Sequence, residues 1–417
     1  MNRIVLIGNG FDLAHGLKTS YADFINWYWE QLKETILHTN QTFINDGLIT
    51  VQLLPRRASG FLYYFQYGAS LGEAVNWSGD KLIDLLSRSG DFEIEQTAFL
   101  EEIMKNIAEK KWVDIERTYY NLLKESRKEH STITVEELNI QLQALTNKLC
   151  EYLKDVEENS AREINNTIKE KIYEPIKLQD IAIESTREST RYFNDRCAKI
   201  HILNLLEKYQ KIGILKNYDL EMLRISYKDD FGHYMQRDYK FATLPEKILL
   251  VNFNYTNIAD QYVLEDQKIA SVIHIHGTLD EPESMIFGYG DEMDKNYMDL
   301  SDLDDNRYLK NIKSHRYLEK SKYRELLQFA NSDKFQIYIM GHACGNSDRT
   351  LLNTLFEHDN CVSIKPFFYQ YGSNDNYNDI IQNISRHFPN RQKFRDRVVN
   401  KTYCEPMPQA KLATDKN

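Results

Sequence analysis

The chain has 417 residues, 42% of them hydrophobic, which is enough to bury a core in one large domain with an insertion or in two domains. Its formal charge of −10 argues against sequence-independent binding to nucleic acid, which needs a basic face. No apolar run approaches the roughly 20 residues that span a bilayer, and no signal peptide precedes the first strand. We therefore expect a cytoplasmic protein with no membrane partner.

The chain opens on a strand that runs into closely spaced glycines. The apolar run 4–7 is followed by Gly8, Asn9, Gly10, Phe11 and Asp12. Glycines after a buried strand leave backbone N–H groups uncovered at the carboxyl edge of a sheet, where a nucleotide phosphate can approach. The third glycine of the dinucleotide fingerprint is missing, and a purely steric turn would explain the same pattern. This stretch alone leaves both interpretations open.

The region up to about residue 245 is mainly helical in pattern. Aromatic and apolar residues at helical spacing predict a helix over 23–37. Residues 134–137 have the form of a capping box, and the apolar residues after it share one helix face, namely Leu138, Leu142, Leu145, Leu149 and Tyr152. This face fits either a partner-binding helix or a helix packed on its own domain, and we favour the second.

After Pro245 the sequence pattern changes to short apolar runs separated by polar segments. Runs of strand length cover 247–251, 271–273, 335–340 and 362–364, with helical patterns over 317–329 and 379–388. We predict an α/β fold with a Rossmann-like, mostly parallel sheet interrupted by a long, mainly helical insertion. Residues 1–55 and 246–400 would form the sheet domain, 56–245 the insertion and 401–417 a tail.

Polar residues follow each predicted strand. Besides the loop after the first strand, these are the segments 252–257, 274–278 and 341–348. Because parallel strands end at one edge of a sheet, we expect these loops to converge on one crevice. Asn, Asp and Gly are common loop residues, but four such ends in register favour a ligand site.

Several polar residues have more than one interpretation. His276 is either a catalyst or a hydrogen-bonded structural group, and a metal bound with His274 is less favoured because no carboxylate or cysteine lies at ligand spacing. Asp12 bonds a ribose, helps to order the opening loop, or caps the next helix. Glu116 either reaches the pocket or pairs with a basic residue on its helix. The acidic segment 280–305 is typical first of a solvated loop, and second of a metal or partner site.

Residues 6–21 resemble the signature opening of the bacteriophage abortive-infection AbiH family. The segments 112–120, 252–257 and 274–277 are similar to the internal motifs of that family, so the resemblance runs through most of the chain. AbiH proteins in turn resemble, more distantly, the sirtuin-like NAD-binding fold of bacterial defence proteins that hydrolyse NAD. The resemblance implies a role in phage defence and a sirtuin-like sheet.

The sirtuin-like pattern also implies roles for individual residues. Gly8 and Gly10 would hold the phosphates of NAD, Asn254 would approach the nicotinamide ribose, and His276 would contact the ribose hydroxyls. The loop 254–257 reads Asn-Tyr-Thr-Asn where sirtuin-like NADases more often show Asn-Tyr-Asp. The five cysteines are scattered and do not form the zinc module of deacetylating sirtuins, so peptide deacylation is not implied and no metal is predicted.

The chemistry of NAD hydrolysis suits these residue types. Breaking the bond between nicotinamide and ribose builds positive charge on the sugar. A neutral histidine, with an ordinary pKa of about 6.5, can accept a proton from a ribose hydroxyl, and an asparagine can hold a water in line. We expect Asn254 and His276 to be catalytic. The expected cofactor-binding residues are Gly8, Asn9, Gly10, Phe11, Asp12, Tyr255, Gly277 and Gly341, with Asn346 and Asp348 on the adenosine side.

The leading hypothesis is an abortive-infection NAD glycohydrolase, with NAD or a related adenine nucleotide as its ligand. A phage-derived trigger and a second copy of the chain are its expected partners. The alternative is a non-hydrolytic nucleotide-binding sensor or assembly module that uses the same crevice. A metal-dependent toxin acting on nucleic acid is least favoured, because the chain is acidic.

Overall fold

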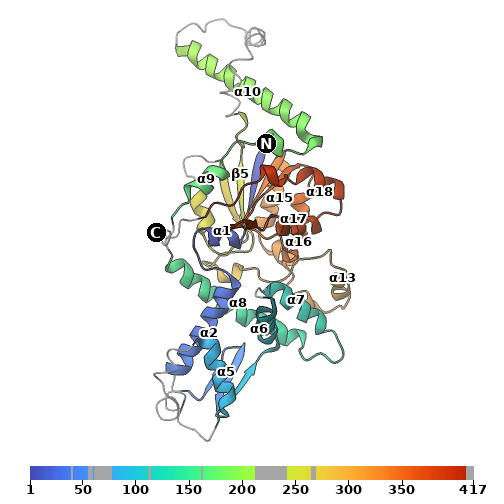
Figure 1. Cartoon of the computed structure of the whole chain (residues 1–417). Helices are drawn as coiled ribbons and strands as arrows, with labels where there is room; N and C mark the ends of the chain where they lie inside the picture. The colour runs from blue at the N-terminus through green and yellow to red at the C-terminus, as the bar shows by residue number, and fades with distance from the viewer. Residues whose placement is uncertain are drawn as a thin grey trace.

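A five-stranded, all-parallel sheet in the order β6-β5-β1-β7-β8 forms the centre of the computed structural model (Figure 1). The structure describes residues 1–38, 41–54, 60, 78–110, 114–160, 163–211, 242–263 and 269–409. The strands are β1 (Asn2–Ile7), β5 (Ile248–Asn252), β6 (Ala270–His274), β7 (Phe335–Met340) and β8 (Cys361–Phe367). The predicted α/β class and its parallel sheet are confirmed.

The first strand is central because it pairs on both sides with strands from the second half of the chain. Ile4 of β1 lies opposite Leu249 of β5 and Ile337 of β7. All residues of β1, β5, β7 and β8 are buried, which explains their continuous apolar runs. The N-terminal strand and the strands after residue 245 therefore belong to one sheet.

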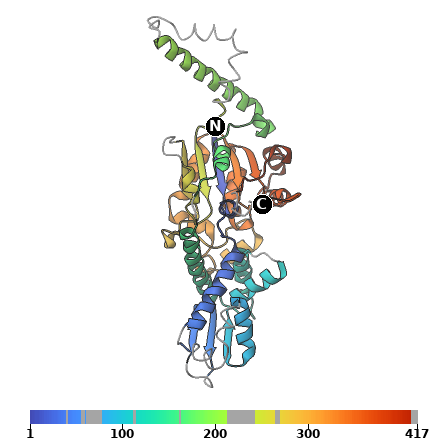
Figure 2. The ribbon, with the colours of Figure 1, turned by 60° about the vertical axis from the view of Figure 1, so that its left-hand side comes forward.

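Helices cover both faces of this sheet (Figure 2). Ile4 and Leu6 pack with residues of α15 (Lys322–Ser332), α16 (Arg349–Phe356) and α17 (Tyr377–Arg386). Val5 and Ile7 face the other side, with residues of α1 (Asn9–Ala14) and α9 (Asn166–Ile172). The alternation along β1 follows from the two-residue period of a strand.

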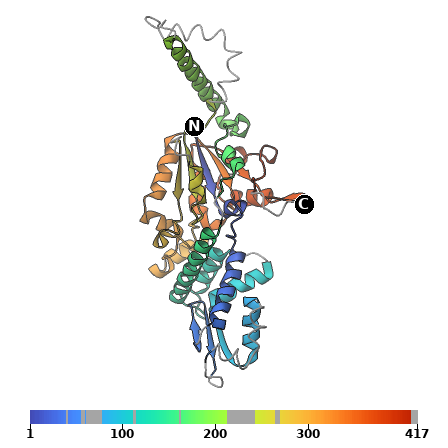
Figure 3. The ribbon, with the colours of Figure 1, turned by 90° about the vertical axis from the view of Figure 1, so that its left-hand side faces the viewer.

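A second layer of helices and a small sheet lies beyond the carboxyl ends of the parallel strands (Figures 1 and 3). Its antiparallel sheet has the order β2-β3-β4. Its elements are α2 (Tyr21–His38), β2 (Phe43–Asn45), β3 (Ile49–Leu53), α5 (Gly79–Ser89), β4 (Phe92–Gln96), α6 (Ala98–Lys110), α7 (Ile115–Glu125) and α8 (Val135–Glu158). The small sheet joins residues on both sides of the boundary expected at residue 55.

Two helix predictions in this layer are confirmed. α2 contains the predicted helix 23–37. At the start of α8, the Thr134 side chain accepts a hydrogen bond from the Glu137 backbone, and the Glu137 carboxylate accepts one from the Thr134 backbone. The predicted apolar residues of α8 are buried in the core of this layer. Trp112 and Val113 of the 112–120 motif lie outside the described residues.

The remaining elements connect or flank these layers. α10 (Ile183–Lys211) projects from the amino end of the parallel sheet (Figures 1 and 2). Within the described ranges, no helix is long and apolar enough to cross a membrane. The others are η2 (Leu178–Asp180), η3 (Ile258–Tyr262), η5 (Pro282–Ser284), α13 (Lys295–Ser301), η6 (Asn306–Tyr308), α14 (Lys313–Arg316), η7 (Tyr317–Glu319), η8 (Asn346–Asp348), β9 (Gln370–Tyr371), β10 (Asn374–Asp375), α18 (Arg391–Arg397) and η9 (Lys401–Tyr403).

The segment after residue 400 packs on the sheet instead of forming a loose tail as far as residue 409. Met407 is buried, and its backbone N–H donates to the Phe368 carbonyl at 2.8 Å, just after β8. The sequence pattern does not reveal these contacts, because they come from scattered residues, among them Cys404, Glu405 and Met407, without apolar periodicity. Residues 410–417 lie outside the described residues.

A buried ion pair ties the segment before α10 to the edge of the sheet. Lys365 of β8 places its Nζ 2.9 Å from Asp180 Oδ2, and both side chains are fully buried. Buried charges are tolerated only when they are paired, so each residue depends on the other.

Gly341, directly after β7, combines a left-handed backbone with a very close contact. Its φ is +76°, and a Cβ there would lie 2.1 Å from the Phe11 backbone N. Gly372 has φ +60° with nothing within 4 Å. We expect both Gly→Ala variants to lose about 1–2 kcal/mol for the backbone conformation, and Gly341→Ala to lose ~1–3 kcal/mol more for the clash. Urea unfolding measures the difference, and equal losses would contradict the close packing.

Candidate functional site

The loops that follow β1 and β5 meet at the carboxyl edge of the sheet. Asn254 Nδ2 donates to the Gly8 carbonyl at 3.0 Å and to Asp12 Oδ1 at 2.8 Å. Asn254 is itself held, because its backbone N–H donates to Asn252 Oδ1 at 3.1 Å. The structure thus brings the N-terminal glycine loop and the asparagine loop into direct contact.

Asp12 connects the other two members of a first group of polar side chains, Asn254 and Thr256. It is 1% exposed within α1, and its second oxygen accepts from the Thr256 hydroxyl at 2.7 Å. Burial raises the pKa of Asp12 from 3.8 to about 7, although the hydrogen bonds from Thr256 and Asn254 oppose the shift. Asp12 therefore ties α1 to the loop after β5. Of its three expected roles, these contacts agree with ordering of the opening loop and not with capping of a helix.

The glycines of the first loop are required by close packing. A Cβ on Gly8 would lie 2.5 Å from His342 Cα, and one on Gly10 would lie 2.8 Å from Gly341 Cα. The backbone N–H groups of Gly8, Gly10 and Phe11 all donate to protein carbonyl groups. These donors are engaged within the protein, so the steric interpretation accounts for both glycines.

A second group of polar side chains surrounds His276, which follows β6 and is 4% exposed. His276 Nδ1 lies 3.2 Å from the Phe253 carbonyl oxygen. Its Nε2 lies 3.1 Å from both the Tyr317 hydroxyl and Asp348 Oδ1. The Tyr317 ring stacks on the imidazole with an interplanar angle of 5°. These contacts fix the plane of the His276 ring.

His276 is neutral near pH 7. Burial and, after it, the positive charge of Lys313 lower the pKa of His276 to about 4, although the Asp348 carboxylate opposes both effects. A neutral ring has one proton and one acceptor nitrogen. It can therefore act as a proton acceptor, which is the role that the sequence assigned to it.

Lys313 stands between two carboxylates from different parts of the chain. Its Nζ lies 2.8 Å from Glu116 Oε2 on α7 and 2.9 Å from Asp348 Oδ1 at the end of η8. Lys313 is 1% exposed, and both carboxylates are buried. Glu116 therefore reaches the site, where its partner is a buried lysine from α14 and not a basic residue on the surface of its own helix.

The pKa values in this group follow from burial and charge. Burial raises the pKa of Glu116 from 4.5 to about 7, Lys313 opposes that shift, and Asp348 reinforces it. Burial disfavours the Asp348 carboxylate as well, but Lys313 and His276 hold its pKa well below the usual range. Burial also acts against the charge of Lys313, yet Asp348 and Glu116 raise the pKa of the ammonium. The Lys313–Asp348 pair is thus ionised, and Glu116 exchanges its proton near neutral pH.

A second histidine approaches Asp348 from the loop after β7. His342 Nε2 lies 3.6 Å from Asp348 Oδ2, and its Nδ1 accepts the Cys344 backbone N–H at 3.0 Å. In the neutral ring the proton is therefore on Nε2, facing the carboxylate. Cys344 has φ +53°, a conformation that few non-glycine residues adopt, and His387 holds it by donating to the Cys344 carbonyl at 2.8 Å.

The other predicted residues lie around these two groups. Tyr255 is buried and donates from its hydroxyl to the Ile286 carbonyl at 3.0 Å. Asn9 is exposed and accepts from the Thr19 hydroxyl at 2.6 Å, and Asn346 is half-buried at the start of η8. Gly277 has φ +86° and packs closely on Ser284. Of the predicted residues, Asp12 and Asn254 share the first group, and His276 and Asp348 share the second.

His274 and His276 contact different carboxylates. His274 Nε2 lies 2.9 Å from Asp260 Oδ2, whereas His276 faces Asp348. The two imidazoles therefore do not share a ligand position. In the acidic segment, Asp294 and Asp305 accept backbone N–H groups at the starts of α13 and η6, and Asp291 pairs with Arg349 at 3.2 Å.

The sequence did not single out Lys313, Tyr317, Thr256 or His342 as site residues. Thr256 and His342 lie within the polar loops that were expected to converge, so proximity to a strand end could have found them. Lys313 and Tyr317 lie on short helices between β6 and β7, with no motif around them. Only the three-dimensional structure places them.

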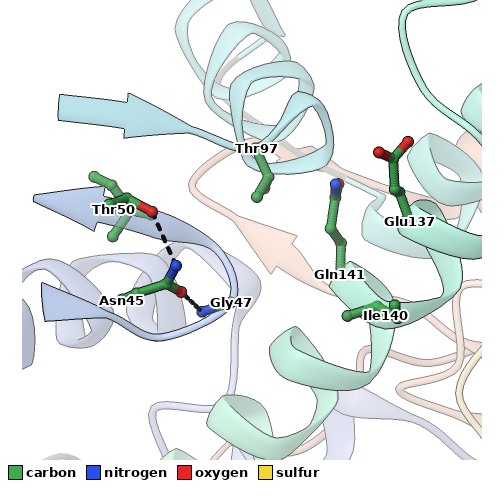
Figure 4. Close-up of a pocket in the computed structure, with 8 residues that line it drawn as sticks. Asn45, Gly47, Thr50, Thr97, Glu137, Ile140 and Gln141 are labelled. Carbon is green, nitrogen blue, oxygen red and sulfur yellow. Dashed lines mark hydrogen bonds between the residues drawn. The ribbon is translucent and has the colours of Figure 1, made fainter.

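A pocket of about 190 Å³ lies away from this edge, between the β2-β3 hairpin and α8 (Figure 4). Asn45 donates to Thr50 Oγ1 at 3.1 Å and accepts the Gly47 N–H at 2.9 Å, so these lining groups are satisfied by one another. The lining residues are Asn45, Gly47, Ile49, Thr50, Thr97, Glu137, Ile140 and Gln141. The pocket contains no predicted site residue, so we place the candidate site at the carboxyl edge, where the buried charges gather.

The raised pKa of Asp12 makes the free energy of unfolding depend on pH. Its folded pKa is raised, so the folded state holds the proton more tightly than the unfolded chain and loses this advantage as pH rises from about 4 to about 7. We expect Asp12→Asn to gain stability relative to wild type across that interval, on the order of 3 kcal/mol. Urea unfolding at pH 5 and pH 8 checks this. Asp379→Asn controls for the loss of one exposed negative charge, and a pH-independent difference for Asp12→Asn would contradict the burial argument.

Comparison with known proteins adds one finding. A family model described as "Bacteriophage abortive infection AbiH" matches residues 4–370. The match includes all four strand-end loops and both groups of the candidate site. A search of curated proteins found no match, and neither did a search of solved structures.

Proposed function

The chain belongs to the AbiH family of bacteriophage abortive infection, and from this premise we propose that it binds NAD and hydrolyses it to nicotinamide and ADP-ribose. Loss of NAD would starve the infected cell and limit the phage. We expect a phage-derived component to trigger the activity, and a second copy of the chain to take part in assembly. A related adenine nucleotide is the other ligand that the same proposal covers.

The charge balance at the carboxyl edge is the observation that carries the proposal. Asp12, Glu116 and Asp348 are buried there, while Lys313 is the buried cation that pairs with two of them. Such an edge favours a developing positive charge more than added negative charge. Cleavage of the nicotinamide–ribose bond develops positive charge on the sugar, whereas phosphoryl transfer brings in negative charge.

His276 and Asn254 supply the two groups that the reaction needs. The neutral ring of His276 can accept a proton from a ribose hydroxyl as the bond to nicotinamide breaks. Asn254 is half-buried beside Asp12, at the border between the buried groups and solvent, where an amide can orient the attacking water. The backbone N–H groups of Gly8, Gly10 and Phe11 are engaged within the protein. The phosphates would therefore rely on other polar groups at this edge, among them the side chains of Asn9 and Asn346.

Incubation of the purified protein with NAD, with products separated by chromatography, tests the proposal. We expect His276→Ala and Asn254→Ala each to lower nicotinamide release by about 10²-fold or more. His358→Ala is the matched control, since it removes an imidazole that accepts the Asn360 N–H just before β8, away from both groups of the site. It should retain most of the activity.

The assay needs phage lysate in one arm, because a defence enzyme is expected to be inactive until infection. NAD binding is measured in parallel by calorimetry. Binding without nicotinamide release in either arm would support the sensor function instead. Release that persists in both His276→Ala and Asn254→Ala would refute the assigned roles.

A further inference from the structure

We propose that Lys313 and Glu116 are positioning residues: Glu116 orients the Lys313 ammonium, and this ammonium holds the Asp348 carboxylate in place beside His276 and His342 while its positive charge offsets the carboxylate at the His276 ring. The proposal concerns the proton state of the site and does not depend on which substrate it takes.

The geometry forms one continuous chain of contacts. Glu116 Oε2 accepts from Lys313 Nζ at 2.8 Å, and the same ammonium donates to Asp348 Oδ1 at 2.9 Å. Asp348 then faces His276 Nε2 at 3.1 Å and His342 Nε2 at 3.6 Å with its two oxygens. The contacts branch at Asp348, which faces both histidines. Moving any of these five side chains therefore displaces at least one neighbour.

Because these contacts are buried, the loss of one charged group is costly for its partners. Lys313 is 1% exposed, and an isolated ammonium there would cost far more than a surface charge. Asp348 alone would face Glu116 with no cation between the two carboxylates, which is unfavourable for like charges. Lys313 therefore fixes the separation of Glu116 and Asp348, and Asp348 fixes the position of both rings.

Groups from five places face His276. They are Asp348 on η8, Lys313 on α14, Tyr317 on η7, His342 after β7 and Tyr255 after β5, whose ring centroid lies 6.4 Å from that of His276. Lys313 is the cation of this set. Its charge opposes protonation of His276, while Asp348 favours it. Removing the ammonium should leave only burial and His342 to oppose the effect of Asp348.

Glu116 brings the helical layer into the same chain of contacts. It lies on α7, beyond the carboxyl ends of the strands, and its other oxygen accepts the Gly288 N–H at 3.4 Å. The histidines lie on the sheet side. The site is therefore complete only when the helical layer and the sheet are docked on each other.

NMR titration of the ¹⁵N-labelled full chain tests the proposal. In wild type we expect His276 to stay neutral from pH 8 to pH 5 and His342 to have its proton on Nε2. In Lys313→Met we expect the titration midpoint of His276 to rise by about one to three pH units, into that window. Lys313→Arg keeps the charge and should keep His276 neutral.

Lys365→Met is the matched control, because Lys365 is an equally buried lysine paired with Asp180 on another part of the sheet. It should destabilise the fold and leave the His276 midpoint unchanged. If Lys313→Met does not fold, the double variant Lys313→Met/Glu116→Gln removes both ends of the pair, a change that buried ion pairs tolerate better than loss of one partner. The same rise is expected in the double variant, and an unchanged His276 midpoint would overturn the proposal.

Discussion

One ammonium group, that of Lys313, pairs with two carboxylates that belong to different layers of the molecule. Glu116 belongs to the helical layer, and Asp348 follows the sheet strand β7. Each of these charges is buried, and a buried charge without its partner is strongly destabilising. The docking of the two layers and the assembly of the candidate site are therefore the same event. The contact lies at this edge because Asp348 follows the carboxyl end of the parallel strand β7, while Glu116 and Lys313 reach the edge from α7 and α14.

The loops at this edge are held by contacts that need no ligand. Asp12, Asn254 and Thr256 join the first loop to the second, while Gly8 and Gly10 let the loop after β7 pack against the first one. This preorganisation has a consequence for function. The backbone N–H groups of Gly8, Gly10 and Phe11 are already bonded to carbonyl groups, so this part of the edge would suit a sugar and a developing cation better than a phosphate. Binding energy for the rest of a nucleotide would have to come from the more exposed rim.

The sequence predicts the parallel sheet because its strands are buried on both faces and appear as continuous apolar runs, as in 335–340. It predicts the start of α8 because a capping box is a local signal. The antiparallel strands were not predicted, because they are short and lie among longer patterns of helical spacing, although the alternation of apolar residues and glutamates in Phe92–Gln96 is itself typical of a half-buried strand. In the site, residues next to a strand end could be predicted. Lys313 could not, because lysine is rarely buried and its partners lie 197 and 35 residues away along the chain.

The two carboxyls with a pKa raised to about 7, Asp12 and Glu116, lie on either side of the candidate site and act on it in the same direction. Each destabilises the fold when it ionises, because its charge is buried. Each ionisation also adds negative charge at the edge, which would favour a cationic transition state. As pH rises through neutrality, the fold therefore loses stability while the edge gains negative charge, which would favour the transition state of the proposed glycosidic cleavage.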